Sequence, residues 1–220
     1  MYIDGKLFHI LAETESERYL GRTLCFRDCH AVEIKRRICA GWAKFHCFKS
    51  ELTGKHYSLQ SRLRLFEAVV STTVLFGSCT WATTKEMLSA LDVARRKMLR
   101  YVLRIFRRND GCEEWPDYLK RVARTVEHCD STYKLVPWSY QARARKWKFA
   151  GELARRRDRR WSSLIVDWKP TWGYRSVGRP CVRWLDDIAR YAGEDWQTLA
   201  LDSDAWEAHS SGFINAEEVV

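Results

Sequence analysis

The sequence predicts a mainly α-helical fold, with a small N-terminal β-hairpin element, a multi-helix bundle and a smaller C-terminal helical segment. Only 4 of the 220 residues are proline, so long helices are permitted. Apolar side chains recur every three or four residues through most of the chain after Asp28, which is the spacing of a helix with one buried face. Hydrophobic residues make up 46% of the sequence, enough for a folded core.

The first 30 residues have the character of strands and turns. Asp4-Gly5 separates the segments 1–3 and 6–10, and both turn residues tolerate the positive φ of a tight hairpin. Tyr19-Leu20-Gly21 and the segment 23–26 predict a further short strand with its turn.

After residue 28 the apolar periodicity predicts a series of helices. The first has its apolar face at positions 34, 38, 42 and 45, and the second, over 58–76, ends at Gly77. The third covers 84–108, about 25 residues and so nearly 40 Å, comparable to one turn of a duplex. Later helices are expected at 113–129 with Pro116 in the first turn, at 140–157 with Ser139 as cap, and at 180–191, 196–201 and 204–209. A linker is expected at 131–137 and irregular structure at 158–177.

Positive charge is concentrated in the middle of the chain. The net charge is +10, and residues 85–160 alone carry 21 Lys and Arg against 10 Asp and Glu, an excess of 11. A field of this kind attracts polyanions, because binding releases the counterions of a phosphate backbone. The alternative interpretation is a set of solvated helix faces without a partner.

Three ordered passages share the pattern of one protein family. The first is Tyr19-Leu20-Gly21, followed by apolar residues at 34, 38 and 42. The second has Leu and Phe at 63 and 66, then Val74-Leu75-Phe76-Gly77-Ser78, Trp at 81 and Arg96-Lys97-Met98-Leu99-Arg100. The third is Gly178-Arg179-Pro180 with Arg183-Trp184 and Asp186-Asp187-Ile188, then Trp at 196 and 206. Together they span 19–206 and resemble the region downstream of the polymerase core in non-LTR (LINE-type) retrotransposon reverse transcriptases. Phe76 stands where that family often has Tyr.

The resemblance implies that the chain is the thumb and post-polymerase region of an RNA-directed DNA polymerase. It divides the chain into the trailing β element of the palm (1–30), a thumb-like helical bundle (31–109), a helix with a linker (110–137) and a basic, Trp-rich helical segment (138–220). RNA and DNA, as a template–primer held without sequence specificity, are the implied partners. The N-terminal polymerase and endonuclease modules of the parent protein would be further partners.

The carboxylate hairpin that holds two Mg²⁺ ions in such polymerases, Tyr/Phe-x-Asp-Asp, does not occur in this sequence. Asp186-Asp187 is the sole Asp-Asp pair, and it lies in a segment expected to be helical, where neighbouring side chains point about 100° apart. A structural or helix N-terminal role is therefore favoured for it over metal catalysis. No catalytic residue is assigned, and the chain is expected to be inactive alone, with Mg²⁺ confined to the absent catalytic module.

The candidate nucleic-acid-binding residues are the cations of two helices, one open Trp and the Arg residues of the third passage. Trp147, in the same basic region, is open to two interpretations, core packing or base stacking. The Gly178-Arg179-Pro180 turn could equally be a backbone contact or a packing corner. The full set is Arg95, Arg96, Lys97, Arg100, Arg104, Arg107, Arg108, Arg143, Arg145, Lys146, Lys148, Trp161, Arg179 and Arg183.

Other function classes have weaker signals. Cys25-x3-Cys29-His30 resembles half a zinc site, but the second ligand pair at recurrent spacing is missing, so no metal is assigned. No Gly-rich phosphate loop or nucleophile–base order suggests a small-molecule substrate. The longest stretch without charge, 68–84, has 17 residues, fewer than the roughly 20 that span a membrane. Eight irregularly spaced cysteines indicate reduced thiols in an intracellular protein. The resemblance implies a nuclear and cytoplasmic location. The rival functions are a stand-alone basic helical adaptor that docks on acidic protein, and a metal nuclease that uses Asp186 and Asp187.

Overall fold

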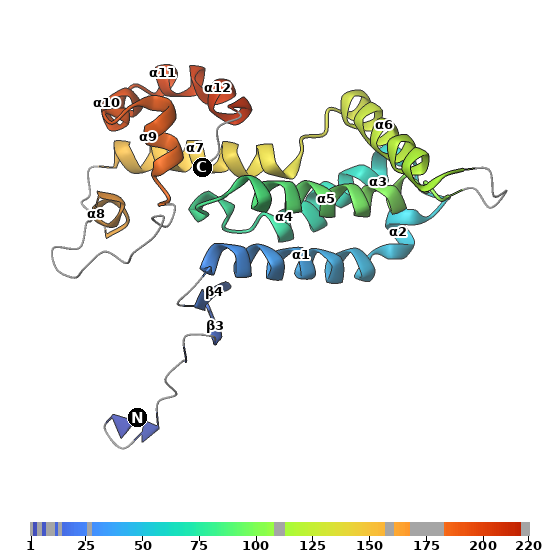
Figure 1. The fold of residues 1–220 in the computed structure, drawn as a ribbon, viewed down its shortest axis with the longest axis horizontal. Coiled ribbons are helices and arrows are strands. Elements are labelled where there is room, and N and C mark those ends of the chain that lie inside the picture. Colours follow the sequence, from blue (N-terminus) through green and yellow to red (C-terminus); the bar gives the residue numbers. More distant parts are fainter. Residues whose placement is uncertain are drawn as a thin grey trace.

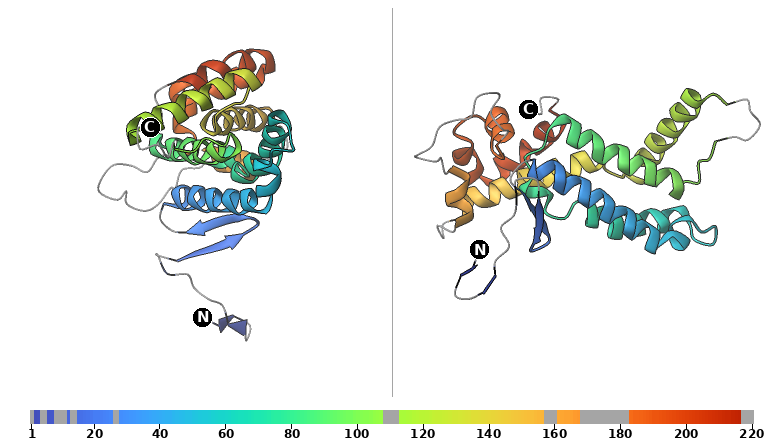
Figure 2. Two further views of the ribbon diagram at one scale, coloured as in Figure 1. Left: turned by 90° about the vertical axis from the view of Figure 1, so that its right-hand side faces the viewer. Right: turned by 60° about the horizontal axis from the view of Figure 1, so that its bottom comes forward.

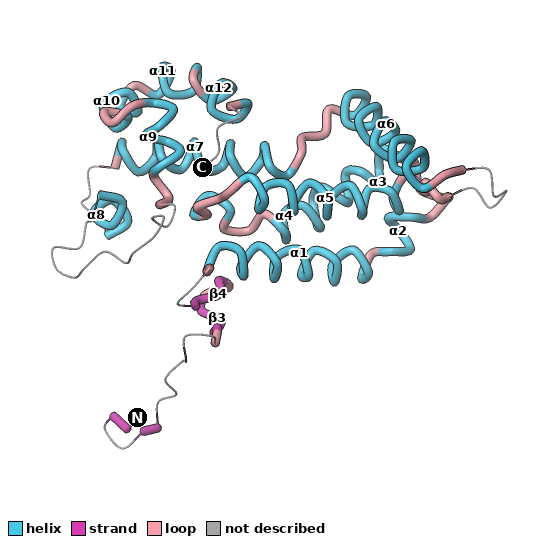
Figure 3. The backbone as a smooth tube through the Cα atoms, viewed as in Figure 1, coloured by secondary structure: helices cyan, strands magenta, loops and turns pink. Residues whose placement is uncertain are grey.

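The computed structural model of the chain describes residues 2–3, 6–7, 12, 15–25, 28–107, 113–156, 161–167 and 183–216. The fold is mainly helical, with small antiparallel β elements at the N-terminus, as the sequence predicts (Figures 1 and 3). Strands β1 (Tyr2–Ile3) and β2 (Lys6–Leu7) pair with each other, on the two sides of Asp4-Gly5. Strands β3 (Ser16–Tyr19) and β4 (Arg22–Cys25) form a second hairpin, whose turn residues Leu20 and Gly21 have φ values of 46° and 82°.

The second hairpin is fixed to the first helix, α1 (Cys29–Cys47), through a buried carboxylate. Glu33 accepts hydrogen bonds from the backbone N–H of Thr23 (2.8 Å) and from the Arg37 side chain (2.6 Å). Burial by itself raises the pKa of Glu33, but hydrogen bonds from Arg36, Thr23 and Arg37 outweigh it and lower the pKa to about 2. Arg36 also donates to the carbonyl of Gly21, at 2.6 Å. The hairpin therefore depends on an ionised Glu33.

The region predicted as one helix over 58–76 is a continuous helical stretch with a change of pitch. After α2 (Lys49–Thr53), α3 (Leu59–Leu65) runs into a π-helical turn, η1 (Phe66–Ser71), and then into α4 (Thr72–Val74). Gly77 ends the stretch with φ 72°, as expected, and a short 3₁₀ turn, η2 (Ser78–Thr80), follows. Periodicity alone does not reveal the π turn, because it inserts a single extra residue into the ladder.

Helix α5 (Lys85–Val102) is shorter than the 84–108 that the sequence predicts. It ends in a Schellman motif: Arg104 has φ 58°, its N–H donates to the carbonyl of Tyr101 (3.1 Å), and the N–H of Ile105 donates to that of Arg100 (2.9 Å). Its 18 residues span about 27 Å rather than 40 Å. Gly or Asn normally marks such an end, so an Arg in this position gave no stop signal in the sequence.

Helix α6 (Trp115–Tyr133) has Pro116 in its first turn, as expected, and ends at Lys134, whose φ is 53°. It is longer than predicted, so the linker to α7 (Trp138–Arg155) is short. Ser139 does not cap α7 but lies inside it. Asp92 of α5 supplies the cap, since its carboxylate accepts hydrogen bonds from the backbone N–H (3.0 Å) and the hydroxyl of Ser139.

Five short helices complete the C-terminal part. They are α8 (Trp161–Asp167), α9 (Asp186–Ala192), α10 (Trp196–Leu201), α11 (Ser203–Ala208) and α12 (Ser210–Asn215). The sequence predicted α10 and α11 closely, but it assigned irregular structure to the α8 region and no helix to α12. Residues 180–182, where the predicted 180–191 helix begins, lie outside the described residues.

Two hydrophobic clusters form the core, and α7 contributes to both. The ribbon shows α7 running from α5 to the C-terminal helices α9–α12 (Figures 1 and 2). The larger cluster joins α1 to α6 with Trp138 at the start of α7. The smaller one joins the rest of α7 to α9–α12 around Trp147, which stacks on Trp206 with ring centroids 3.7 Å apart. Each of these indole N–H groups donates to the other residue's backbone carbonyl, at 2.9 and 3.0 Å. Trp147 is therefore a core residue.

One described helical stretch, Leu59–Thr80, is long and apolar enough to span a membrane by length and composition alone. One face of it lies in the larger core, where Phe66, Val70 and Val74 are fully buried. The stretch contacts α1 and α5, so its apolar face is covered by protein. We assign it to the core.

Candidate nucleic-acid interface

Helix α5 presents a line of cations on the side opposite its buried face. Leu88, Leu91, Met98 and Val102 point into the core, and the helical period then places Arg96, Lys97 and Arg100 on the outer side. Arg104 lies two positions beyond the helix, in the left-handed turn that ends it. Arg96, Lys97 and Arg104 are exposed, and Arg100 is half-buried with its guanidinium 4.8 Å from the ring centroid of Tyr101. These four residues are called the α5 basic stripe below.

None of the four cations of the stripe forms a salt bridge with a carboxylate in the described part of the chain. The arrangement suits phosphate groups, because Arg and Lys on one helix face contact a backbone without reading bases. Arg107, just beyond the helix, is exposed and donates to the carbonyl of Glu113 at 2.8 Å. Arg108 lies outside the described residues.

Arg95 does not belong to this surface, which corrects the sequence-based assignment. Its side chain is 4% exposed and forms two hydrogen bonds, of 2.9 and 2.7 Å, to the carboxylate of Asp130 in α6. The physical reason is the helical period: Arg95 is one position from Arg96, about 100° around the helix, and points at α6. Arg95 therefore holds two helices together.

Two cations of α7 are likewise interior and are removed from the candidate surface. Arg143 donates to the carbonyls of Phe213 and Ala216, and burial lowers its pKa. Lys146 lies 2.9 Å from Oδ2 of Asp187, and burial lowers the pKa of Lys146 while Asp187 opposes that shift. Both face the C-terminal helices, because α7 is packed on two sides and has no wide solvent face.

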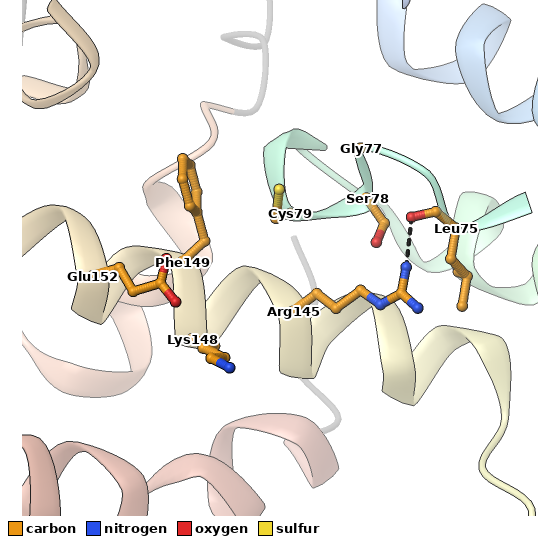
Figure 4. Close-up of a pocket in the computed structure, with 8 residues that line it drawn as sticks. All are labelled: Leu75, Gly77, Ser78, Cys79, Arg145, Lys148, Phe149 and Glu152. Carbon is orange, nitrogen blue, oxygen red and sulfur yellow. Dashed lines mark hydrogen bonds between the residues drawn. The ribbon is translucent and has the colours of Figure 1, made fainter. Parts of the chain in front are cut away.

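Arg145 and Lys148 border an open pocket of about 290 Å³ between α7 and the η2 corner (Figure 4). The Arg145 side chain reaches toward the corner and donates to the carbonyl of Leu75 at 2.8 Å. Among the described residues, none forms a hydrogen bond with the buried hydroxyl of Ser78. Glu152 lines the same pocket, so the pocket carries both positive and negative side chains. Burial raises the pKa of Cys79 at its edge, and Arg145 and Arg22 oppose that shift.

The remaining candidates lie in the C-terminal part. Trp161 is 78% exposed and Arg183 is exposed. Arg179 and the Gly178-Arg179-Pro180 turn lie outside the described residues. Trp184, by contrast, is half-buried and donates its indole N–H to the carbonyl of Cys79 at 2.8 Å, which ties this segment to the η2 corner.

The Asp186-Asp187 pair is engaged in protein contacts. Asp186 accepts a hydrogen bond from the backbone N–H of Arg183 (2.7 Å) at the start of α9, and Asp187 is paired with Lys146. Among the described residues, no group of three or more His, Cys, Asp and Glu side chains is placed to hold a metal ion. In the half zinc motif, the pKa of the Cys25 thiol is raised to about 11 by burial and by Cys29.

Sequence reasoning missed one group of surface residues, at the junction of α5 and α6. Phe106 and Trp115 are 60% and 53% exposed there, and Arg121 of α6 donates to the carbonyl of Phe106 at 2.9 Å. Periodicity gave no signal for Trp115, because it precedes the buried Tyr118, Val122 and Val126 at helical spacing and is therefore expected on the covered face of α6.

The chain matches no protein family and no solved structure. It is similar to a transposon-derived protein of Caenorhabditis elegans, with 27% identity over 207 residues. The alignment covers 90% of this chain and 71% of that protein. The similarity points to a transposon origin for the chain.

Proposed function

We propose that this chain is a non-catalytic part of a transposon-encoded reverse transcriptase, and that it holds RNA and DNA without sequence specificity. The resemblance of three ordered passages to non-LTR retrotransposon polymerases and the similarity to a transposon-derived protein support this origin. In the proposed parent protein, Mg²⁺ and the catalytic carboxylates belong to the polymerase module, which would act in the nucleus and cytoplasm. The chain alone is expected to give no incorporation in a primer-extension assay with Mg²⁺ or Mn²⁺.

The α5 basic stripe is the observation that carries the proposal. Arg96, Lys97 and Arg100 lie on one helix and Arg104 lies just beyond its end, and no described carboxylate neutralises them. Four phosphate contacts give a slope of log K against log salt of about −3.6. Raising the salt from 50 to 200 mM should then weaken binding by about 150-fold.

The test is fluorescence anisotropy with a labelled duplex and a labelled RNA strand at several salt concentrations. In the variant Arg96→Gln/Lys97→Gln/Arg100→Gln, the slope should become shallower by about 2.7, because three phosphate contacts are lost. The matched control is Arg18→Gln/Lys35→Gln/Arg190→Gln, which removes three exposed cations from β3, α1 and α9. The control changes the net charge equally and should keep most of the slope.

Equal losses in the two triple variants would contradict the proposal, because the net charge and not the stripe would then account for binding. Salt-insensitive binding to a folded acidic protein, with no affinity for nucleic acid, would favour the basic adaptor instead.

A further inference from the structure

The junction of α5 and α6 exposes aromatic rings in a place where the backbone is firmly held. The phenol of Tyr118 donates to the carbonyl of Ile105 (3.3 Å), and Arg121 donates to that of Phe106 (2.9 Å). Phe106 and Trp115 are nevertheless 60% and 53% exposed. An exposed aromatic ring lacks the stabilisation that burial usually gives it. Large exposed rings on a fixed backbone therefore mark contact surfaces.

Three cations lie close to these rings. Arg104 and Arg107 follow the last turn of α5, and Arg107 donates to the carbonyl of Glu113, two positions before Trp115. Arg121 of α6 donates to the carbonyl of Phe106, and its guanidinium lies 5.5 Å from the ring centroid of Tyr118. We call Phe106, Trp115 and these three cations the junction patch.

The carboxylates near the patch neutralise only part of its charge. Glu113 pairs with Arg121 at 2.7 Å. Arg104 and Arg107 form no salt bridge among the described residues. Arg104 also closes the α5 basic stripe, so the patch continues the same cationic surface.

The backbone of Arg104 adds a second indication. Its φ of 58° lies in the left-handed region, where a residue with a Cβ is disfavoured by about 1 kcal/mol relative to glycine. A cation is thus kept at a position where glycine would stabilise the helix end, as is expected when the charge itself has a use.

We propose that the junction patch binds single-stranded nucleic acid, with unpaired bases stacked on Trp115 and Phe106 and phosphates held by Arg104 and Arg107. This inference rests on the proposed function and deepens it, because it specifies single-stranded nucleic acid as the ligand at the end of the α5 basic stripe. Cations alone do not distinguish a duplex from a single strand. Exposed rings do, since the faces of paired bases are already covered by their neighbours in the duplex.

The test compares a 20-nucleotide oligo(U) strand with a blunt duplex of equal length, in anisotropy titrations with the full chain. Phe106→Ala and Trp115→Leu should each weaken oligo(U) binding by about fivefold or more, and should leave duplex binding within about twofold. Leu at 115 keeps an apolar contact for Tyr118, whose ring centroid lies 5.4 Å from that of Trp115. Tyr19→Ala is the control, because Tyr19 is 61% exposed in the distant β3–β4 hairpin.

The outcomes separate the two proposals. If neither probe binds, the proposed function fails, and the inference fails with it. If the duplex binds but both ring variants hold oligo(U) as tightly as the parent chain, the inference is overturned and the proposed function stands. Tighter binding of poly-glutamate than of oligo(U), lost in the same variants, would also overturn it, since the patch would then be a site for acidic protein. Far-UV circular dichroism checks that each variant is folded. If Trp115→Leu is unfolded, the result for Phe106→Ala decides the test.

Discussion

Arg95 and Arg96 are neighbours in the sequence, and they should respond to substitution in opposite ways. Arg95→Gln removes both hydrogen bonds to Asp130, whose side chain is 19% exposed. Breaking a buried ion pair from one side costs about 3–5 kcal/mol, because the remaining charge is left without a partner. Asp130 keeps some contact with water, so we expect a loss near the lower end, about 3 kcal/mol in the free energy of unfolding.

Arg96→Gln should change the free energy of unfolding by no more than about 0.5 kcal/mol, because Arg96 is exposed and forms no salt bridge within the described residues. It should instead make the slope of log K against log salt shallower by about 0.9. Under conditions where the Arg95→Gln variant is folded, that slope should be unchanged.

Urea unfolding followed by circular dichroism measures the first quantity, and anisotropy with a labelled duplex measures the second. Asp130→Asn serves as the companion of Arg95→Gln, since it removes the same ion pair from the α6 side. The division between the two Arg residues is refuted if Arg95→Gln unfolds at the urea concentration of the parent chain, or if it alone flattens the salt dependence.

Three further predictions concern single positions. Gly151→Ala should destabilise the chain by about 1–3 kcal/mol in urea unfolding, because a Cβ there would lie 2.6 Å from the indole ring of Trp206. Since Ala favours helices, the same change in a Trp206→Leu background should be neutral or stabilising. The free energy of unfolding should fall by up to about 3 kcal/mol as the pH drops from about 5 towards 2. The pKa of Glu33 is lowered to about 2, so the ionised carboxylate stabilises the fold fully only above the ordinary carboxyl pKa. A Glu33→Gln variant with the same pH dependence would contradict this. Arg104→Gly should stabilise the chain by about 0.5–1 kcal/mol by relieving the left-handed φ, while weakening nucleic-acid binding; a loss of stability would show that the side chain, and not the backbone, decides the helix end.

The α5 basic stripe and Arg95 show where sequence reasoning succeeds and where it stops. A period of 3.6 residues identifies the buried face, and with it a mostly helical fold. It does not say whether a cation at the edge of that face meets solvent or another helix. Arg95, Arg143 and Lys146 all lie at such edges, and their partners Asp130, Phe213 and Asp187 are 35, 70 and 41 positions away along the chain.

The sequence also failed to predict where some of the helices end. Gly77 was read correctly, because glycine takes a positive φ without strain. Arg104 and Lys134 end α5 and α6 with the same backbone geometry but carry no such signal. The cap of α7 by Asp92 was equally hidden, because a capping side chain from another helix leaves no local pattern.

The sequence by itself determined the helical class, the small β-hairpin element before the first helix, the cationic middle of the chain and the absence of a Tyr/Phe-x-Asp-Asp motif. These follow from local backbone preferences, from the period of apolar residues and from composition, all of which act over a few neighbouring residues. Only the tertiary structure decided which of the many cations stay in solvent and which are buried against carboxylates and carbonyls. Those pairings are set by contacts between helices far apart in the chain, and a side chain's charge has no fixed role until its neighbours in space are known.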